Sequence, residues 1–167
     1  MGMRSPSATA PSAARVGRSV DGNGWARCSL GHRHWGRFGA AGLLITDGAS
    51  VLLQHRAAWT HEGDTWAVPG GARDSHEDPI TAALREVAEE TTLDPLSVTP
   101  LHEWVDDHGG WSYTTIVAST TSTAPVAPVN AESTDIRWWP IAAVSGLHLH
   151  HGFAAAWPTL QTLLGRT

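Results

Sequence analysis

The chain has 167 residues, of which 41% are hydrophobic, so it is long enough for one domain with a substantial core and too short for two ordinary domains. Its formal net charge of −5 disfavours nonspecific binding to nucleic acid, because a negative surface repels a polyanion. No stretch approaches the roughly 18 apolar residues of a membrane-spanning helix, and one cysteine, Cys28, excludes an intrachain disulfide. We therefore expect a soluble, cytoplasmic protein with a single globular domain.

The N-terminal region differs in composition from the remainder of the chain. Its first twenty residues hold Ser, Ala, Pro, Gly and Arg, with no acidic residue and little apolar material to pack. We predict a disordered tail over residues 1–24, an approach segment over 25–35 and the folded domain over 36–167. An organelle transit peptide can have this composition, but a low-complexity terminus without a targeting role is the more common explanation.

The approach segment contains a possible metal-binding pattern. Cys28, His32 and His34 have a C-x3-H-x-H spacing, but a structural zinc site normally needs four ligands in paired spacing. No fourth ligand is evident, so we favour a packed or mobile segment. The same reasoning applies to His148 and the pair at 150–151, which we expect in a loop before the last helix.

Residues 37–56 hold two apolar runs separated by Asp47-Gly48, a sequence typical of a tight hairpin, so we predict two antiparallel strands there. After a polar connection, a short apolar segment runs into Pro69, Gly70 and Gly71. The backbone must turn sharply at this point.

A helical pattern begins at Asp78, which is suited to cap it, with Pro79 in the first turn. The helix should end near Thr92, because Leu93-Asp94-Pro95 cannot continue it. One buried stripe is predicted at helical spacing: Ile80, Leu84, Val87 and Thr91.

Further strands and one further helix follow. Alternating patterns predict strands over residues 96–105 and 111–120, separated by a turn at 106–110, and another over 131–140 after a Pro-rich loop. A final helix carries apolar residues at helical spacing, and Pro158 within it should cause a kink or mark a new start. These apolar residues are Phe153, Trp157, Leu160 and Leu164. The order of elements predicts an α/β domain in which a mixed sheet packs between helices.

The first helix carries an unusual concentration of negative charge. Glu86, Glu89 and Glu90 share one arc of its surface with Arg85, and the helix contains no lysine to balance them. Spacing alone favours a solvated acidic face. However, hard divalent cations select clustered carboxylate oxygens, and Mg²⁺ is commonly held by a few carboxylates together with substrate phosphates.

The acidic helix lies within a longer motif. Residues 71–93, GARDSHEDPITAALREVAEETTL, resemble the Nudix box, G-x5-E-x7-R-E-U-x-E-E-x-G-U with U aliphatic, and match eight of its nine defined positions. Thr92 stands where the family usually has glycine. A left-handed backbone there would strain threonine by about 1 kcal/mol or more, so we expect a different exit turn. The resemblance extends to roughly residues 36–165 and implies a Nudix-type α/β/α sandwich.

The resemblance also implies roles for the residues of the motif. Glu86, Glu89 and Glu90 would bind one to three Mg²⁺ or Mn²⁺ ions with the backbone carbonyl of Gly70. A glutamate and an arginine at the positions of Glu77 and Arg85 pair in the family and hold the metal-binding carboxylates in place. Gly71 opens the box and supports the same loop. Catalytic roles are expected for Arg85, Glu89, Glu90 and Glu132.

The general base and the base-binding residues are less closely defined. Nudix enzymes take the base from the helix or from a later loop, and we rank Glu132 above Glu103, Asp106 and Asp107, although a solvated loop glutamate is equally consistent with its position. Aromatic rings stack on nucleobases. Three candidate base contacts are Trp35, Trp104 and Trp111.

The resemblance predicts metal-dependent hydrolysis of a phosphoanhydride bond in a small-molecule nucleotide. We expect a MutT-like nucleoside triphosphate pyrophosphohydrolase, with oxidised nucleotides among its candidate substrates; ADP-ribose, dinucleoside polyphosphates and capped RNA are the alternative substrates. A second hypothesis for the function is a catalytically silent Nudix domain that senses a nucleotide. A Nudix-fold isoprenoid diphosphate isomerase is a third, for which Cys28 is the only available cysteine. The sequence is also compatible with a homodimer.

Overall fold

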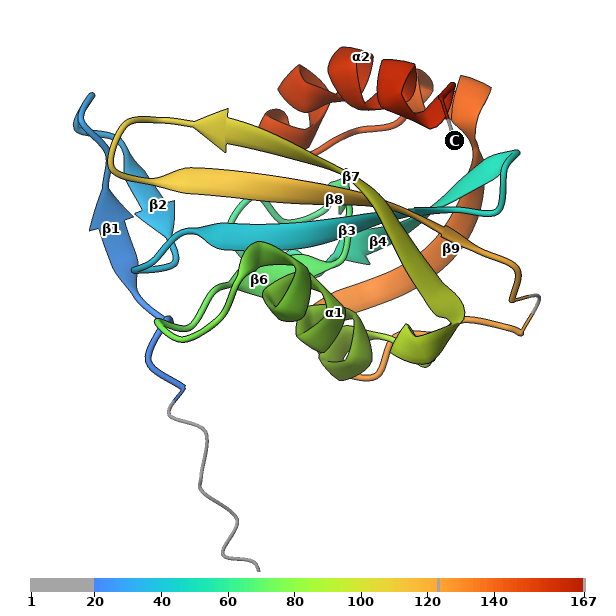
Figure 1. Cartoon of the computed structure of the whole chain (residues 1–167), viewed down its shortest axis with the longest axis horizontal. Coiled ribbons are helices and arrows are strands. Elements are labelled where there is room, and N and C mark those ends of the chain that lie inside the picture. Colours follow the sequence, from blue (N-terminus) through green and yellow to red (C-terminus); the bar gives the residue numbers. More distant parts are fainter. Residues whose placement is uncertain (1–19, 123, 167) are drawn as a thin grey trace, which may run out of the picture.

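The computed structural model describes residues 20–122 and 124–166. A mixed β-sheet lies between two helices, α1 (Pro79–Glu90) and α2 (His151–Leu164), as Figure 1 shows. The predicted α/β/α sandwich is therefore confirmed. Neither these helices nor any other helix in the described ranges is long and apolar enough to cross a bilayer.

The main sheet has seven strands in the order β5-β4-β3-β8-β7, with β6 paired to β3 and β9 paired to β4. The pair β3–β8 is parallel and the others are antiparallel, which makes the sheet mixed. The strands are β3 (Ala40–Thr46), β4 (Ser50–Arg56), β5 (Trp66–Ala67), β6 (Gly70–Ala72), β7 (Val98–Asp107), β8 (Ser112–Thr120) and β9 (Ser133–Pro140). Two short 3-10 helices, η1 (Pro95–Ser97) and η2 (Ile141–Gly146), follow α1 and β9.

The predicted hairpin over residues 37–56 is present, but its strands separate soon after the turn. Asp47 accepts backbone hydrogen bonds from Ala49 and Ser50, and β3 pairs with β4 only at Thr46 and Val51. Beyond that pair, β6 lies along β3, whereas β5 and β9 lie along β4. This separation lets the glycine-rich strand β6 enter the sheet beside β3.

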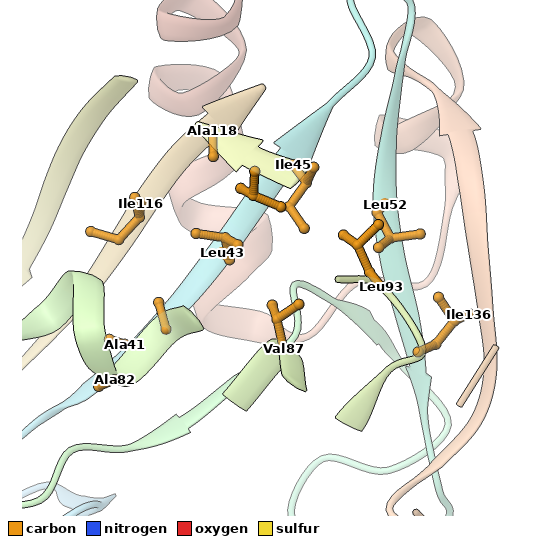
Figure 2. Packing of buried hydrophobic residues seen from close by; sticks show 12 residues of the cluster. Ala41, Leu43, Ile45, Leu52, Ala82, Val87, Leu93, Ile116, Ala118 and Ile136 are labelled. Carbon is orange, nitrogen blue, oxygen red and sulfur yellow. The ribbon is translucent and has the colours of Figure 1, made fainter. Parts of the chain in front are cut away.

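Alternation along β3 and β4 creates two cores, one on each face of the sheet. Leu43 and Leu52 face α1 and pack with Val87, whereas their neighbours Leu44 and Leu53 face α2. Figure 2 shows the first of these clusters between α1 and the strands. Burial on both faces explains why the sequence of these strands is an almost continuous apolar run.

Helix α1 starts as predicted, because the Asp78 carboxylate accepts a hydrogen bond of 2.8 Å from the backbone N–H of Thr81. Val87 is fully buried, and Ile80 and Leu84 pack against the same core from its edge. The last helical residue is Glu90, two residues before the predicted end.

The exit from α1 differs from a left-handed glycine turn, as the sequence predicts. Thr92 exchanges hydrogen bonds with Ala127, whose N–H donates to the threonine hydroxyl at 2.9 Å and whose carbonyl accepts the Thr92 N–H at 3.0 Å. Among the described non-glycine residues, positive φ angles occur only at Glu62 and Asp64, so Thr92 avoids the strained region. Pairing with the Pro-rich loop therefore replaces the usual glycine turn.

The C-terminal helix contains Pro158 but is assigned as one continuous helix, so the proline does not mark a new start. Its buried residues include Phe153, Trp157, Leu160 and Leu164, as the apolar spacing predicts.

The N-terminal part of the chain is more structured than the sequence suggests. Of the predicted disordered tail, residues 1–19 lie outside the described residues, but Asp21 and Gly22 donate backbone hydrogen bonds to the Asp74 carboxylate at 2.9 and 2.8 Å. The prediction of disorder is thus wrong for the end of that segment. The predicted approach segment forms a separate two-stranded ribbon, β1 (Trp25–Arg27) and β2 (Arg33–Trp35).

Restoring the family glycine should weaken this protein. Thr92→Gly removes the hydroxyl that accepts from Ala127 and adds a flexible residue at a position that does not need a positive φ. We expect the free energy of unfolding, measured by urea denaturation, to fall by about 1 to 2 kcal/mol.

Thr92→Ser is the matched control, because it keeps the hydroxyl, and its stability should stay close to that of the wild type. A Thr92→Gly protein as stable as the wild type would show that the pairing with Ala127 contributes little.

Candidate active site

The acidic helix contacts the turn after β5 at Gly70 and Gly71. The N–H of Gly70 donates to the Glu90 carboxylate at 3.0 Å. A Cβ atom placed on Gly71 would lie 2.6 Å from Oε1 of Glu86, closer than non-bonded atoms allow. The Glu86 carboxylate therefore lies directly against Gly71, a contact that only glycine permits, whereas a side chain at Gly70 would collide with Ala41 and Gly42 of β3 and with the Tyr113 hydroxyl.

Arg85 connects the carboxylates of this region. Its guanidinium makes a two-point ion pair with Glu77, at 2.7 and 2.9 Å, and donates to the Ala72 carbonyl at 2.9 Å. It also contacts Glu86 at 2.8 Å and Glu89 at 3.2 Å. These five contacts fix the arginine, confirm the predicted pairing with Glu77, and attach the helix to the loop before it.

Burial makes the two inner carboxylates hard to ionise. Burial, opposed by Arg85, raises the pKa of Glu86 to about 7. Burial and the nearby charge of Glu86 raise the pKa of Glu90 to about 8, although the Gly70 N–H favours its ionised form. The charge of Glu132 raises both pKa values further. A bound divalent cation would favour the ionised form of both carboxylates, because its positive charge offsets the cost of burying them in that form. Two such carboxylates therefore suit a cation site.

The donor chemistry fits a hard divalent metal ion. Glu86 and Glu90 offer carboxylate oxygens beside the backbone of the glycine turn, and carboxylate oxygens are the ligands that Mg²⁺ and Mn²⁺ prefer. Glu89 lies at the exposed edge of this group of carboxylates. Its side chain is 57% exposed, against 13% for Glu86, and it is paired with Arg85. Among the described residues, Glu86, Glu89 and Glu90 do not form a group of three in which one carboxylate oxygen from each residue lies within 4.8 Å of the other two.

The candidates for a general base lie in different surroundings. Glu132 is exposed, and its backbone carbonyl accepts the Ala57 N–H at 2.8 Å; its charge acts on both inner glutamates. By contrast, Asp106 contacts His108, Asp107 accepts the Gly109 N–H, and Glu103 is exposed on β7. Of these four residues, Glu132 is the one whose charge raises the pKa values of Glu86 and Glu90 among the main causes of those shifts.

Two residues near the acidic helix, Arg56 and Tyr113, belong to no motif or pattern that would identify them from the sequence. Arg56, at the end of β4, donates through two nitrogens to the His61 carbonyl at 3.2 and 3.0 Å, and its charge lowers the pKa of Glu90. Burial and the charge of Glu90 raise the pKa of Tyr113. The Tyr113 hydroxyl occupies the space that a side chain at Gly42 would fill. The pairing of β8 with β3 places Tyr113 near the acidic helix, and the position of β4 in the sheet does the same for Arg56. Neither placement can be read from the sequence.

The three predicted aromatic base contacts have different surroundings. Trp111 is buried, donates to the Gly36 carbonyl at 2.9 Å and stacks on His34, so it is not available to a base. Trp104 is half-buried against the core beneath α2. Trp35 is 45% exposed and packs edge-on against Trp25.

Comparison with known proteins agrees with this geometry. The family model described as NUDIX domain matches residues 36–162. The chain belongs to the Nudix family. It is an enzyme of the Nudix hydrolase class, whose members need a divalent metal ion.

Several Nudix relatives are similar over most of the chain. A protein named "Putative 8-oxo-dGTP diphosphatase 3" from Mycobacterium tuberculosis is 45% identical over 153 residues, covering 85% of this chain and 70% of its own. The crystal structure of a Nudix hydrolase from M. smegmatis, RenU, has a TM-score of 0.80 and 43% identity, covering 87% of this chain and 96% of its own. A C. elegans Ap4A hydrolase, with 20% identity, a TM-score of 0.63 and coverage of 77% and 99%, shares the fold alone.

The inner carboxylates of this Nudix domain should make its stability depend on pH in the metal-free state. A folded-state pKa raised above the unfolded value of 4.5 means that stability is fully present below that value and lost as pH rises through the folded pKa. We expect the melting temperature in EDTA to fall as pH rises from about 5 to 8 and to level off above the folded pKa of Glu90, with a loss on the order of 1 kcal/mol or more.

Glu90→Gln cannot ionise, so it should flatten this slope. A metal-free wild type whose stability stays constant between about pH 5 and 8, or a Glu90→Gln protein with the same slope as the wild type, would contradict the assignment of the shift to Glu90.

Proposed function

We propose that this chain is a Mg²⁺- or Mn²⁺-dependent nucleoside triphosphate pyrophosphohydrolase that releases a nucleoside monophosphate and pyrophosphate, with oxidised purine nucleotides such as 8-oxo-dGTP as its preferred substrates. The observation that carries the proposal is the pair Glu86 and Glu90, buried against Gly70 and Gly71 with raised pKa values. The name of the M. tuberculosis relative supports the substrate class.

The acidic helix holds the metal in this proposal. Glu86 and Glu90 are the principal ligands, the Gly70 carbonyl assists them, and Glu89 serves as an outer ligand. A bound divalent cation neutralises phosphate charge and lowers the pKa of an attached water. Arg85 and Glu77 position the ligands without binding the metal, because their charges are already paired with each other.

Two residues outside the helix complete the site. Glu132 is the general base that takes the proton of the attacking water, since its charge already acts on the metal-binding pair. Arg56 is the cation that faces the triphosphate. Its guanidinium is anchored by the His61 carbonyl and lies close enough to influence Glu90.

The other readings are less well supported. A silent nucleotide-binding module has no need for two carboxylates buried at a cost to folding, because binding alone does not require them. An isomerase would need a reactive thiol, but Cys28 is buried and packs with Ala40 and Trp111 in the N-terminal ribbon.

The proposal predicts the outcome of a substrate screen. With Mg²⁺ or Mn²⁺ present, 8-oxo-dGTP should be hydrolysed with a higher kcat/KM than dGTP, ADP-ribose or diadenosine tetraphosphate, with pyrophosphate as the second product. Glu90→Gln should lower kcat by about 10² to 10⁴, because it removes a carboxylate that acts in the reaction. Product release measured by ³¹P NMR or a coupled phosphate assay checks both.

Glu103→Gln, on the exposed side of β7, is the matched control and should retain wild-type turnover. Glu132→Gln in the same assay tests the base, since it should lower kcat with little effect on KM. Wild-type turnover in Glu90→Gln would overturn the assignment of the site, and a preference for ADP-ribose would overturn the substrate class.

A further inference from the structure

We propose that Asp21, upstream of the Nudix domain, is a positioning residue for the metal-binding carboxylates. This inference rests on the proposed function. Asp21 and Gly22 bond to Asp74 and Ser75, in the loop that joins β6 to α1; we call these four residues the N-terminal clasp. The clasp sets the position of Glu77 and, through it, of Arg85.

The contacts of the clasp are reciprocal. One oxygen of the buried Asp74 carboxylate accepts the N–H groups of Asp21 and Gly22 at 2.9 and 2.8 Å. In return, the Asp21 carboxylate accepts the Ser75 N–H at 2.8 Å and the Ser75 hydroxyl at 2.6 Å. Hydrogen bonds to a carboxylate are among the stronger ones, so four of them hold the two segments in one register.

The close approach of the two segments requires a glycine. A Cβ atom on Gly22 would lie 2.0 Å from the Arg73 carbonyl oxygen. The Gly22 carbonyl also accepts the Arg37 N–H at 2.8 Å, which ties the clasp to the start of the domain. The segment is thus packed against the loop as well as bonded to it.

The loop under the clasp has no strand or helix of its own to hold it. It begins after Ala72, the last residue of β6, and ends at Asp78, the cap of α1. Within it, the Asp74 N–H donates to the Glu77 carboxylate at 3.1 Å, and the Glu77 N–H donates to the Asp74 carbonyl at 3.1 Å. Movement of Asp74 therefore moves Glu77.

Glu77 transmits that position to the acidic helix. Its carboxylate makes the two-point pair with Arg85, which in turn contacts Glu86 and Glu89. A continuous series of hydrogen bonds thus runs from Asp21 to the carboxylates that bind metal. Residues that orient metal ligands without touching the ion change metal affinity or activity substantially when they are removed.

The experiment measures Mn²⁺ affinity by electron paramagnetic resonance of the free ion, together with kcat and KM, on the full chain. Asp21→Ala should weaken Mn²⁺ binding by about 3- to 10-fold and lower kcat by a similar factor, with an unchanged KM for the nucleotide at saturating metal. Asp21→Asn should restore wild-type values, because its amide can accept from the Ser75 N–H and donate to the Ser75 hydroxyl. Gly22→Ala should act like Asp21→Ala.

Asp94→Ala is the matched control. Like the half-buried Asp21, the exposed Asp94 accepts a backbone hydrogen bond through its carboxylate, from Leu96 at 2.9 Å, but it caps η1, which follows α1. Both alanine variants should lose similar stability, and only Asp21→Ala should lose Mn²⁺ affinity. Equal Mn²⁺ affinity in the two variants would overturn the inference while leaving the proposed function intact. Unchanged Mn²⁺ affinity in Glu90→Gln would instead overturn the proposed metal site.

Discussion

The site depends on the ion pair between Arg85 and Glu77. Helix α1 carries Glu86, Glu89 and Glu90 within five residues, and Arg85 is the cation that contacts Glu86 and Glu89 directly. It remains in place because Glu77, almost fully buried, binds it at two points and the Ala72 carbonyl binds it at a third. These three contacts hold the guanidinium toward the loop, so that Arg85 joins the loop to the helix as well as contacting the glutamates.

The second requirement is a close contact between backbone and carboxylate. Gly71 allows Glu86 to lie against the turn, the Gly70 N–H donates to Glu90, and burial raises the pKa values of both carboxylates. The fold maintains this contact from both sides, since β6 is paired with β3 and Val87 anchors the helix in the core below. Burial makes the ionised form of both carboxylates unfavourable, and the attraction between them and a bound divalent cation would offset this cost.

Much of this arrangement could be predicted from the sequence, because its signals are local. The Asp78 cap, the helical stripe through Val87 and the Asp47-Gly48 hairpin each depend on neighbouring residues, and the motif identified Glu77 as the partner of Arg85. The contacts that the sequence did not reveal join distant segments. Arg56 and Tyr113 reach the cluster only through strand pairing, and the bonds between Asp21 and Ser75 link residues 54 positions apart. Trp111 was expected at a base but lies in a core, because aromatic residues serve both purposes.

Anomalous X-ray diffraction from a crystal soaked in Mn²⁺ tests the central claim most directly, because it locates the ion without reference to activity. The account predicts a strong peak bounded by Glu86, Glu90 and the Gly70 carbonyl, with Arg85 still bound to Glu77. A peak confined to the other clusters of potential ligands, at His61, Glu62 and His150 or at Asp74, His76 and Glu77, would contradict it, as would the absence of any peak beside the glycine turn.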